Sequence, residues 1–270
     1  MTIDWDGAAL AASPRYAALR PVLERLPVDR PPTLAELNAL AAQRGVFSGG
    51  GAPVRFVATA SAGAGSPSAG ADYERRIHAT GAVAMREASV HDRFNAMAWL
   101  VFPAAKAALN RLHCEHRGAG RVTRGTPRDV LTLFDEDGLV LLTADASLAT
   151  LLLEFRWTAL FVERRGDVIR DARFLGFGHA LHEKLLAPFR GLAAKVIVIE
   201  ADRALLAASA EAQLRHADWA LAARLADPAT LASTRSLAPL PVLGIPGWAA
   251  ENENPAYYAD AAQFRPGRRK

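Results

Sequence analysis

Apolar residues recur at helical spacing over residues 1–45, which we expect to form N-terminal helices. A first helix is predicted over residues 14–26. A second is predicted to begin after Thr33, because Glu36 lies three residues further on, at the spacing of a capping box. It should end near Gln43, since Gly45 is typical of the residue that follows a helix.

Residues 46–72 are rich in Gly, Ser, Pro and Ala, which predicts flexible loops around a short strand at 54–59. The glycine clusters at 49–51 and 63–65 continue neither into Gly-Lys-Ser/Thr nor into a dinucleotide fingerprint, so we do not interpret them as a phosphate-binding loop. Residues 73–80 and 82–85 flank Gly81 and are expected to pair as a short hairpin.

Helical and strand patterns alternate further along the chain. A helix is predicted to start with Thr126 as N-cap, Pro127 in the first position and Asp129 in the first turn, and to end at Asp137-Gly138. More helices are expected at 146–156, 178–186 and 202–226, and strands at 139–143 and 195–200, while residues 157–162 fit either element.

The longest helical pattern begins near Ser89 and ends near His113, and Pro103 should kink it. One sector of this helix is an ordinary core face, made of Phe94, Met97, Val101, Ala105, Ala108 and Leu112. A second sector mixes polar and aromatic residues, namely His91, Asn95, Trp99, Phe102, Lys106, Asn110 and His113. This stripe is expected to face a cavity or another polar element, and a satisfied polar core is the alternative.

These patterns indicate an α+β class, with a helix-rich single domain over residues 1–270 and a few short strands. Within it, residues 1–45 form the N-terminal helices, 46–72 the Gly/Ser loops and 73–238 the main body. The proline-rich C-terminal tail, residues 239–270, is expected to pack on the body.

Composition and charge exclude several classes of protein. No run approaches the roughly 18 apolar residues of a spanning helix, and the N-terminus lacks the basic and apolar regions of a secretory signal. The single cysteine, Cys114, excludes an internal disulfide and a multi-cysteine zinc site, so we expect a cytoplasmic protein. The net charge is +4 and the arginines are scattered, which argues against nucleic acid as a partner. A small-molecule ligand or a protein partner remains open.

The candidate chemistry centres on the polar stripe and on two later segments. In the stripe we select His91, Asp92 at its edge, Asn95 and His113. The partners that we expect to approach it are His179, Asp135 and Glu136. Their carboxylates would orient an imidazole, which would act as general base or as a metal ligand. The metal candidates are His91, His179 and Asp135, and the cofactor they suggest is a divalent metal ion.

Two local patterns match named motifs only weakly. His179, His182 and Glu183 are spaced for one helix face, but their order is not that of the zinc proteases. The acidic turn at 135–138 resembles the Asp-x-Asp-Gly motif of haloacid-dehalogenase-type phosphatases. The matching later motif at 166–167 is only about 30 residues away, too close for the intervening strands and helices of that fold. We therefore interpret this turn as the end of a helix.

Taken together, the motifs resemble the uncharacterised bacterial family called domain of unknown function 3025. The residues that carry the resemblance are Tyr73-Glu74, Ile77, Gly81, His91-Asp92, Phe94-Asn95-Ala96, Trp99, Phe102-Pro103, Lys106, Leu109-Asn110, His113, Arg128-Asp129, Thr132-Leu133-Phe134-Asp135-Glu136, Trp157, Leu160-Phe161, Phe177-Gly178-His179-Ala180, Glu183-Lys184, Pro188, Leu240-Pro241-Val242-Leu243-Gly244-Ile245-Pro246-Gly247-Trp248 and Phe264-Arg265-Pro266. The lead-in Ala88-Ser89-Val90 departs from the pattern, where a more polar or aromatic sequence is expected. The resemblance implies that the motifs belong to one fold, and it implies no known activity.

The sequence leaves two functions open. The first expectation is a non-catalytic binding or structural protein, in which the polar residues form structural networks. The alternative is a hydrolase-type enzyme, with or without a metal ion. The two differ in geometry, because an active site requires His91, His113, His179 and Asp135 to converge within about 5 Å where solvent can reach them.

Overall fold

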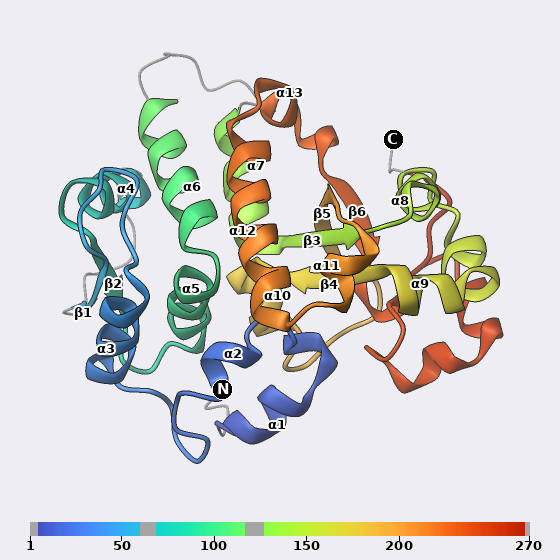
Figure 1. The fold of residues 1–270 in the computed structure, drawn as a ribbon, viewed down its shortest axis with the longest axis horizontal. Coiled ribbons are helices and arrows are strands. Elements are labelled where there is room, and N and C mark those ends of the chain that lie inside the picture. The colour runs from blue at the N-terminus through green and yellow to red at the C-terminus, as the bar shows by residue number, and fades with distance from the viewer. Residues whose placement is uncertain (1–4, 60–68, 117–126, 268–270) are drawn as a thin grey trace.

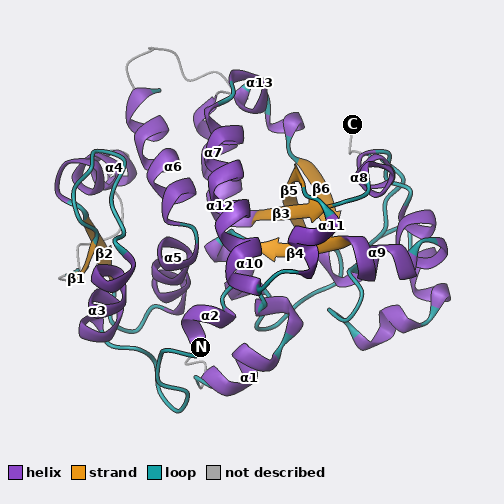
Figure 2. Ribbon diagram, in the orientation of Figure 1, coloured by secondary structure: helices purple, strands orange, loops and turns teal. Residues whose placement is uncertain are grey.

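The computed structural model of the chain describes residues 5–59, 69–116 and 127–267. Within these residues helices dominate, and six strands form two small sheets (Figure 2). This is the α+β arrangement that the sequence predicts. One of the sheets lies with the N-terminal third of the chain and the other at the centre of the molecule (Figure 1).

The N-terminal segment departs from the predicted helix over 14–26. It contains α1 (Gly7–Ala12), which we did not predict, then a 3-10 turn (Pro14–Tyr16) and the short helix α2 (Arg20–Leu23). The long helix was wrong because Pro21 has no N–H to donate to the preceding turn, so the helix restarts with proline in its first turn.

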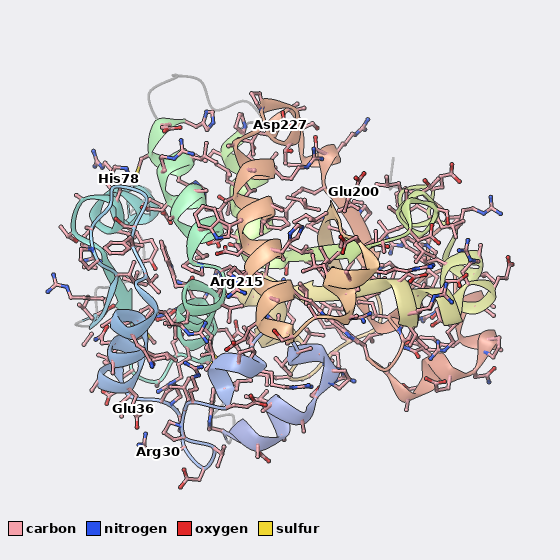
Figure 3. The ribbon with its side chains drawn as sticks, in the orientation of Figure 1. Arg30, Glu36, His78, Glu200, Arg215 and Asp227 are labelled. Carbon is pink, nitrogen blue, oxygen red and sulfur yellow. The ribbon has the colours of Figure 1, made fainter. Side chains whose placement is uncertain are left out.

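The next helix, α3 (Leu34–Arg44), confirms the predicted capping box. Thr33 and Glu36 exchange side chain to backbone hydrogen bonds, and Gly45 ends the helix at φ 61°. Arg30 adds two hydrogen bonds to the Glu36 carboxylate, at 2.6 and 2.9 Å, and the two side chains lie together beside the start of α3 (Figure 3).

The predicted hairpin around Gly81 is wrong. Residues of its first arm belong to the helix α4 (Ala69–Thr80), and the strand β2 (Ala82–Met85) pairs in parallel with β1 (Arg55–Ala58). Tyr73 and Ile77 are spaced four apart and Ile77 is buried, so the helical period outweighs the strand-like composition. The predicted glycine-rich loop at 61–71 lies outside the described residues up to position 68, and its last residues begin α4.

The long helix predicted from Ser89 to His113 is two helices, α5 (Val90–Val101) and α6 (Pro103–Glu115). Phe102 separates them with φ −122° and ψ 57°. The break is sharper than the predicted kink because proline also excludes the helical conformation of the residue before it. The backbone N–H groups of Ala104 and Ala105 donate to the carboxylate of the buried Asp218, at 3.0 and 2.8 Å.

Asp218→Ala should lower the free energy of unfolding by about 2 kcal/mol, because it leaves a buried N–H of α6 without an acceptor. Asp227→Ala is the matched control, since the Asp227 side chain caps a short helix through an exposed hydrogen bond from the Ala229 N–H (Figure 3 labels Asp227). We expect a loss of at most about 1 kcal/mol there. Urea unfolding of both variants measures the difference, and equal losses would contradict this role of Asp218.

The central sheet has the strand order β4-β3-β5-β6, in which β3 and β5 are parallel and both outer strands are antiparallel to their neighbours. Its strands are β3 (Gly138–Thr143), β4 (Ala172–Gly176), β5 (Ala193–Glu200) and β6 (Ala238–Pro241). The helices around it are α7 (Pro127–Asp137), α8 (Ala146–Leu153), α9 (Arg165–Asp171), α10 (His179–Lys184), α11 (Arg203–Ala207), α12 (Ala210–Ala226) and α13 (Pro228–Leu231). Helices α7 and α12 pack on β3 and β5, while α8 contacts β3 and β6.

Two of these elements refine the sequence interpretation. The single helix predicted over 202–226 is divided into α11 and α12, because Ser209 leaves the helical conformation and its hydroxyl caps α12 through Ala212. The ambiguous segment at 157–162 contains a π-helical turn, Ala159–Glu163. The predicted N-cap Thr126 lies outside the described residues.

The proline-rich tail packs on the body as far as it is described. Trp248, Tyr258 and Phe264 are buried, and the Trp248 carbonyl accepts a 2.6 Å hydrogen bond from Arg15 near the other end of the chain. The buried Asn252 donates to the carbonyls of Leu243 and Ile245, which fixes the turn before it. No described helix combines the length and the apolar character that crossing a membrane requires.

Candidate functional site

Helices α5, α6, α7 and α10 meet beside the end of the central sheet where β3 begins and β4 ends (Figure 1). Six polar side chains from these helices contact one another there. We refer to them as the polar cluster: His91, Asn95, Lys106, Asp135, His179 and Glu183.

A glycine lets α10 approach α7. The backbone N–H groups of Phe177 and Gly178 both donate to the Gly138 carbonyl, at 3.0 and 2.8 Å. A Cβ atom on Gly178 would lie 2.2 Å from the Glu136 carbonyl oxygen, so no other residue fits. This close approach brings His179, the first residue of α10, next to Asp135 in the last turn of α7.

Lys106 is the buried centre of the cluster. Its side chain is 4% exposed, and its Nζ donates to Asp135 Oδ1 at 2.5 Å and to Asn95 Oδ1 at 2.9 Å. The ammonium also lies over the Trp99 ring, 5.4 Å from the ring centre. Because a buried ammonium needs partners, this ion pair holds α6 against α5 and α7.

Asp135 is ionised, whereas His179 beside it is neutral. Burial is the largest influence on the pKa of Asp135 and would raise it, but the ammonium of Lys106 together with His179 and His113 holds that pKa below its usual range. Burial lowers the pKa of His179 to about 4, so its ring is neutral at pH 7. Its Nδ1 is 3.9 Å from Asp135 Oδ2, which is too long for a hydrogen bond, and it has no other hydrogen-bond partner within the described ranges.

His91 and Glu183 bring the cluster to the surface. His91 Nδ1 lies 2.8 Å from Glu183 Oε2, and the two side chains are 34% and 42% exposed. A carboxylate can only accept, so we assign the proton to Nδ1, which leaves Nε2 as an acceptor. The His91 ring meets the His179 ring edge to face, with centres 4.4 Å apart.

A mostly apolar cavity of about 320 Å³ is lined by the N-terminal segment and by residues that flank this pair in the sequence, and neither His91 nor Glu183 lines it. Val90 and Phe94 line it from α5, and Leu185 and Leu186 line it from the end of α10. Trp5, Leu10 and Tyr16 line it from the N-terminal segment. Asp6, Ala9 and Arg15 also line it, and Tyr16 and Phe94 of its lining stack on His182.

The remaining polar groups of the stripe have structural partners. Asn95 Nδ2 donates to the Tyr73 hydroxyl at 3.2 Å, and burial raises the pKa of Tyr73 so that it keeps its proton. Asn110 donates to the carbonyl and the carboxylate of Glu74 and accepts from Gly49 N–H. Asn110 thus makes its hydrogen bonds outside the polar cluster.

Three of the candidate residues lie apart from the polar cluster or at its edge. The Asp92 carboxylate accepts two hydrogen bonds of 2.9 Å from the Arg86 side chain and one from the Arg86 backbone N–H. Glu136 is exposed, and its carbonyl packs under Gly178. His113 is buried on α6, where burial lowers its pKa to about 4 against the attraction of Asp135. The structure brings together His91, Asn95, Asp135 and His179.

The sequence alone did not select Glu183, Lys106 or Tyr73 for the site. Two signals in the sequence could have indicated them. Lys106 lies in the polar stripe, on the same helical face as Asn95, and Glu183 follows His179 by four residues, which is one turn of helix. His182, which shares their segment, points the other way and stacks on Tyr16 and Phe94. Only the packing of α10 on α5 shows which of these side chains meet.

Within the described ranges, no group of three or more His, Cys, Asp or Glu side chains is arranged to hold a metal ion. The metal candidates His91, His179 and Asp135 contact one another in pairs and form no ligand set in this structure. His91 meets the His179 ring edge to face, and His179 Nδ1 lies 3.9 Å from Asp135 Oδ2, so neither contact is a hydrogen bond.

Residues 54–268 match the family described as Protein of unknown function (DUF3025). No curated protein and no solved structure matches the chain. The match includes every residue of the polar cluster and begins after α3.

Proposed function

The chain belongs to the family described as Protein of unknown function (DUF3025), and we propose that it is a hydrolase in which His91, oriented by Glu183, acts as general base. The observation that carries the proposal is the half-exposed His91–Glu183 pair, whose neighbours in the sequence line a mostly apolar cavity. The class of substrate that fits is an ester with an apolar acyl group, which the cavity would hold.

The proposed reaction uses water as the nucleophile. His91 Nε2 takes a proton from a water molecule, whose oxygen adds to the acyl carbon of the ester. The imidazolium then gives that proton to the alcohol oxygen as its bond to carbon breaks, which yields a carboxylic acid and an alcohol. Glu183 is a positioning residue, because its carboxylate holds the proton on Nδ1 and stabilises the imidazolium.

The neutral state of His179 supports this role of His91. A charged ring at 4.4 Å would oppose the protonation of His91, whereas a neutral ring does not. Lys106 and Asp135 pair with each other behind it, and the carboxylate of Glu183 contacts His91 directly.

Replacing His91 by glutamine should lower the rate of ester hydrolysis by about 100-fold or more. The assay follows nitrophenol release from the p-nitrophenyl esters of acetate, butyrate and octanoate, between pH 5.5 and 8.5, with EDTA or with added Mg²⁺, Mn²⁺ or Zn²⁺. We expect the rate to be greater for the longer acyl chains.

Glu183→Gln should lower the rate less, because glutamine keeps a hydrogen-bond acceptor for Nδ1 but no longer stabilises the imidazolium with a negative charge. His216→Gln is the matched control, since His216 is exposed on α12 and its ring contacts only the Glu200 carbonyl, at 3.4 Å, in the described structure. The proposal fails if wild type hydrolyses none of the esters faster than His91→Gln does.

A non-catalytic binding role is the second candidate. Lys106 and Asn110 favour it, because both are buried and have side-chain partners from neighbouring helices, as structural networks do. Equal rates for wild type and His91→Gln on every ester would favour this candidate.

A further inference from the structure

Strand β4 is an edge of the central sheet, because it pairs with β3 on one side only (Figure 1). In an antiparallel pair, alternate residues turn their N–H and C=O groups away from the partner strand. The hydrogen bond from Ala144 N–H to the Asp171 carbonyl, at the end of this ladder, fixes the alternation. Ala172 and Phe174 therefore turn their backbone groups outward along the edge.

Phe174 is the residue whose outward groups are unpaired. At Ala172 both groups are bonded, because the N–H donates to the Val168 carbonyl and the carbonyl accepts from the Arg173 side chain at 2.7 Å. The N–H and C=O of Phe174 have no hydrogen-bond partner within the described residues. An unpaired N–H and C=O on the edge of a sheet form a template for a further strand.

A mostly apolar cavity of about 340 Å³ is lined by residues 172–175 of this edge. Ile169 of α9, Leu214 of α12, and Ile245 and Trp248 of the tail also line it. Ile169 is 60% exposed, so the apolar lining continues to the surface. The volume lies within the range of ligand-binding cavities and offers apolar side chains a place beside the unpaired backbone groups.

Arg20 and Arg173 are the charged residues of this lining, all of which is described, and no Asp or Glu belongs to it. Arg20 donates to the Ala11 carbonyl, and the bonds of Arg173, which include those to Ala172 and Leu206, also go to backbone carbonyls. Neither guanidinium forms an ion pair with a carboxylate of the described structure. Carbonyls leave the two positive charges in place, so the cavity complements an acidic partner.

We propose that an extended acidic peptide binds this cavity as an added strand beside β4. One of its residues exchanges two backbone hydrogen bonds with Phe174, its apolar side chains enter the cavity, and its carboxylates meet Arg20 and Arg173. A single unpaired residue on the edge suits a short segment of about five residues. The cavity shares no residue with the polar cluster, so the proposal stands independently of the hydrolase function.

The test uses acetylated pentapeptide amides of the sequence Glu-Val-X-Val-Glu, in which X is Ala, Val, Leu, Phe or Trp. Calorimetry on the full chain measures their affinity. We expect the best of them to bind with a Kd below about 100 μM, and its counterpart with lysine in place of glutamate to bind at least about tenfold more weakly. Failure of every acidic peptide to bind below about 1 mM, or equal affinity for the lysine counterpart, overturns the proposal.

N-methylation of the best peptide tests the strand pairing. One version carries the methyl group on X and the other on the valine that follows X, so the two differ only in which N–H is lost. Neighbouring N–H groups of a strand point to opposite sides, so only one version loses the bond to Phe174. We expect that version to bind about tenfold more weakly than the other. Equal affinities of the two versions overturn the added strand.

Two tryptophan variants locate the site. Ala210→Trp should abolish binding, because Ala210 lines the cavity from an exposed position at the start of α12. Ala223→Trp is the matched control, since Ala223 is exposed on the same helix outside the lining, and it should bind as wild type does. Thermal melts confirm that both variants are folded, and unchanged affinity in Ala210→Trp overturns the proposal.

Sedimentation of the same three proteins tests a second copy of the chain as the occupant. We expect wild type and both variants to sediment as monomers. A wild-type dimer that Ala210→Trp dissociates and Ala223→Trp does not would assign the β4 edge to a second copy and overturn the peptide.

Discussion

Replacing Lys106 by methionine is expected to lower the free energy of unfolding by about 3–5 kcal/mol, because it leaves the Asp135 carboxylate without its counter-ion. Methionine preserves the volume and the contact with Trp99, so the change tests the charge. Asn95 loses its ammonium partner at the same time. Chemical denaturation at pH 7 measures the loss.

Lys184→Met is the matched control. Lys184 forms an ion pair with Asp137 at 2.6 Å, close to the 2.5 Å of the Lys106 pair, but its side chain is 38% exposed against 4% for Lys106. We therefore expect a loss of at most about 1 kcal/mol. Similar losses in the two variants would show that burial does not determine how much the Lys106–Asp135 ion pair contributes to the free energy of unfolding.

Removing both charges distinguishes an ion pair from a packing effect. Lys106→Met/Asp135→Leu should recover most of the stability that Lys106→Met loses, since no unpaired charge remains. In Lys106→Met alone, we also expect the pKa of His179 to rise from about 4, because Lys106 no longer opposes its protonation. NMR titration of the histidine rings would detect this rise, and an unchanged His179 would contradict the electrostatic coupling.

Local signals in the sequence predicted those elements whose causes are local. The capping box of Thr33 and Glu36 marks α3, and the Pro-Arg-Asp start and the glycine after Asp137 mark α7. Each of these signals acts within one turn of helix, so the printed sequence contains all of it. The strand β3 was predictable for the same reason, as an apolar run beside a glycine.

The polar cluster was only partly predictable. His91, Asn95 and Lys106 share a stripe that helical periodicity reveals, even though the helix is broken at Phe102. Glu183 could not be assigned, because its contact with His91 joins residues 92 positions apart. The contact depends on the approach of α10 to α7 at Gly178, which is a property of the tertiary fold. The prediction of a hairpin around Gly81 failed for the same reason, because no local pattern in the sequence shows that β2 pairs with β1 across α4.

Acidification below pH 6.5 should destabilise the protein through its buried histidines. Burial lowers the pKa of His113, His179 and His182 to about 4, from about 6.5 in the unfolded chain. Their contribution to stability is therefore fully present above pH 6.5 and is lost as the pH falls from 6.5 toward 4. Each histidine contributes about 3 kcal/mol over this interval.

Asp218 acts in the opposite direction. Burial raises its pKa to about 6, so the folded protein takes up a proton at Asp218 before the unfolded chain does. Near pH 5 unfolding should then bind about three protons at the histidines and release about one at Asp218. The net uptake of about two protons corresponds to a slope of about 2.5 kcal/mol per pH unit, with stability falling toward acid.

Two variants separate these contributions near pH 5. His182→Leu removes a ring that stacks on Tyr16 and Phe94 and has no hydrogen-bond partner within the described structure, so it should reduce the proton uptake to about one. Asp218→Asn should increase the proton uptake on unfolding to about three, because no proton is then released from residue 218. His216→Gln alters an exposed ring and should leave it at about two. Denaturant unfolding at pH 4.5, 5.0 and 5.5 gives each slope. If the free energy of unfolding of the wild type does not fall between pH 5.5 and 4.5, the three histidine rings are protonated in the folded protein. His179 would then be charged, and it could not be the neutral neighbour that leaves His91 free to accept a proton.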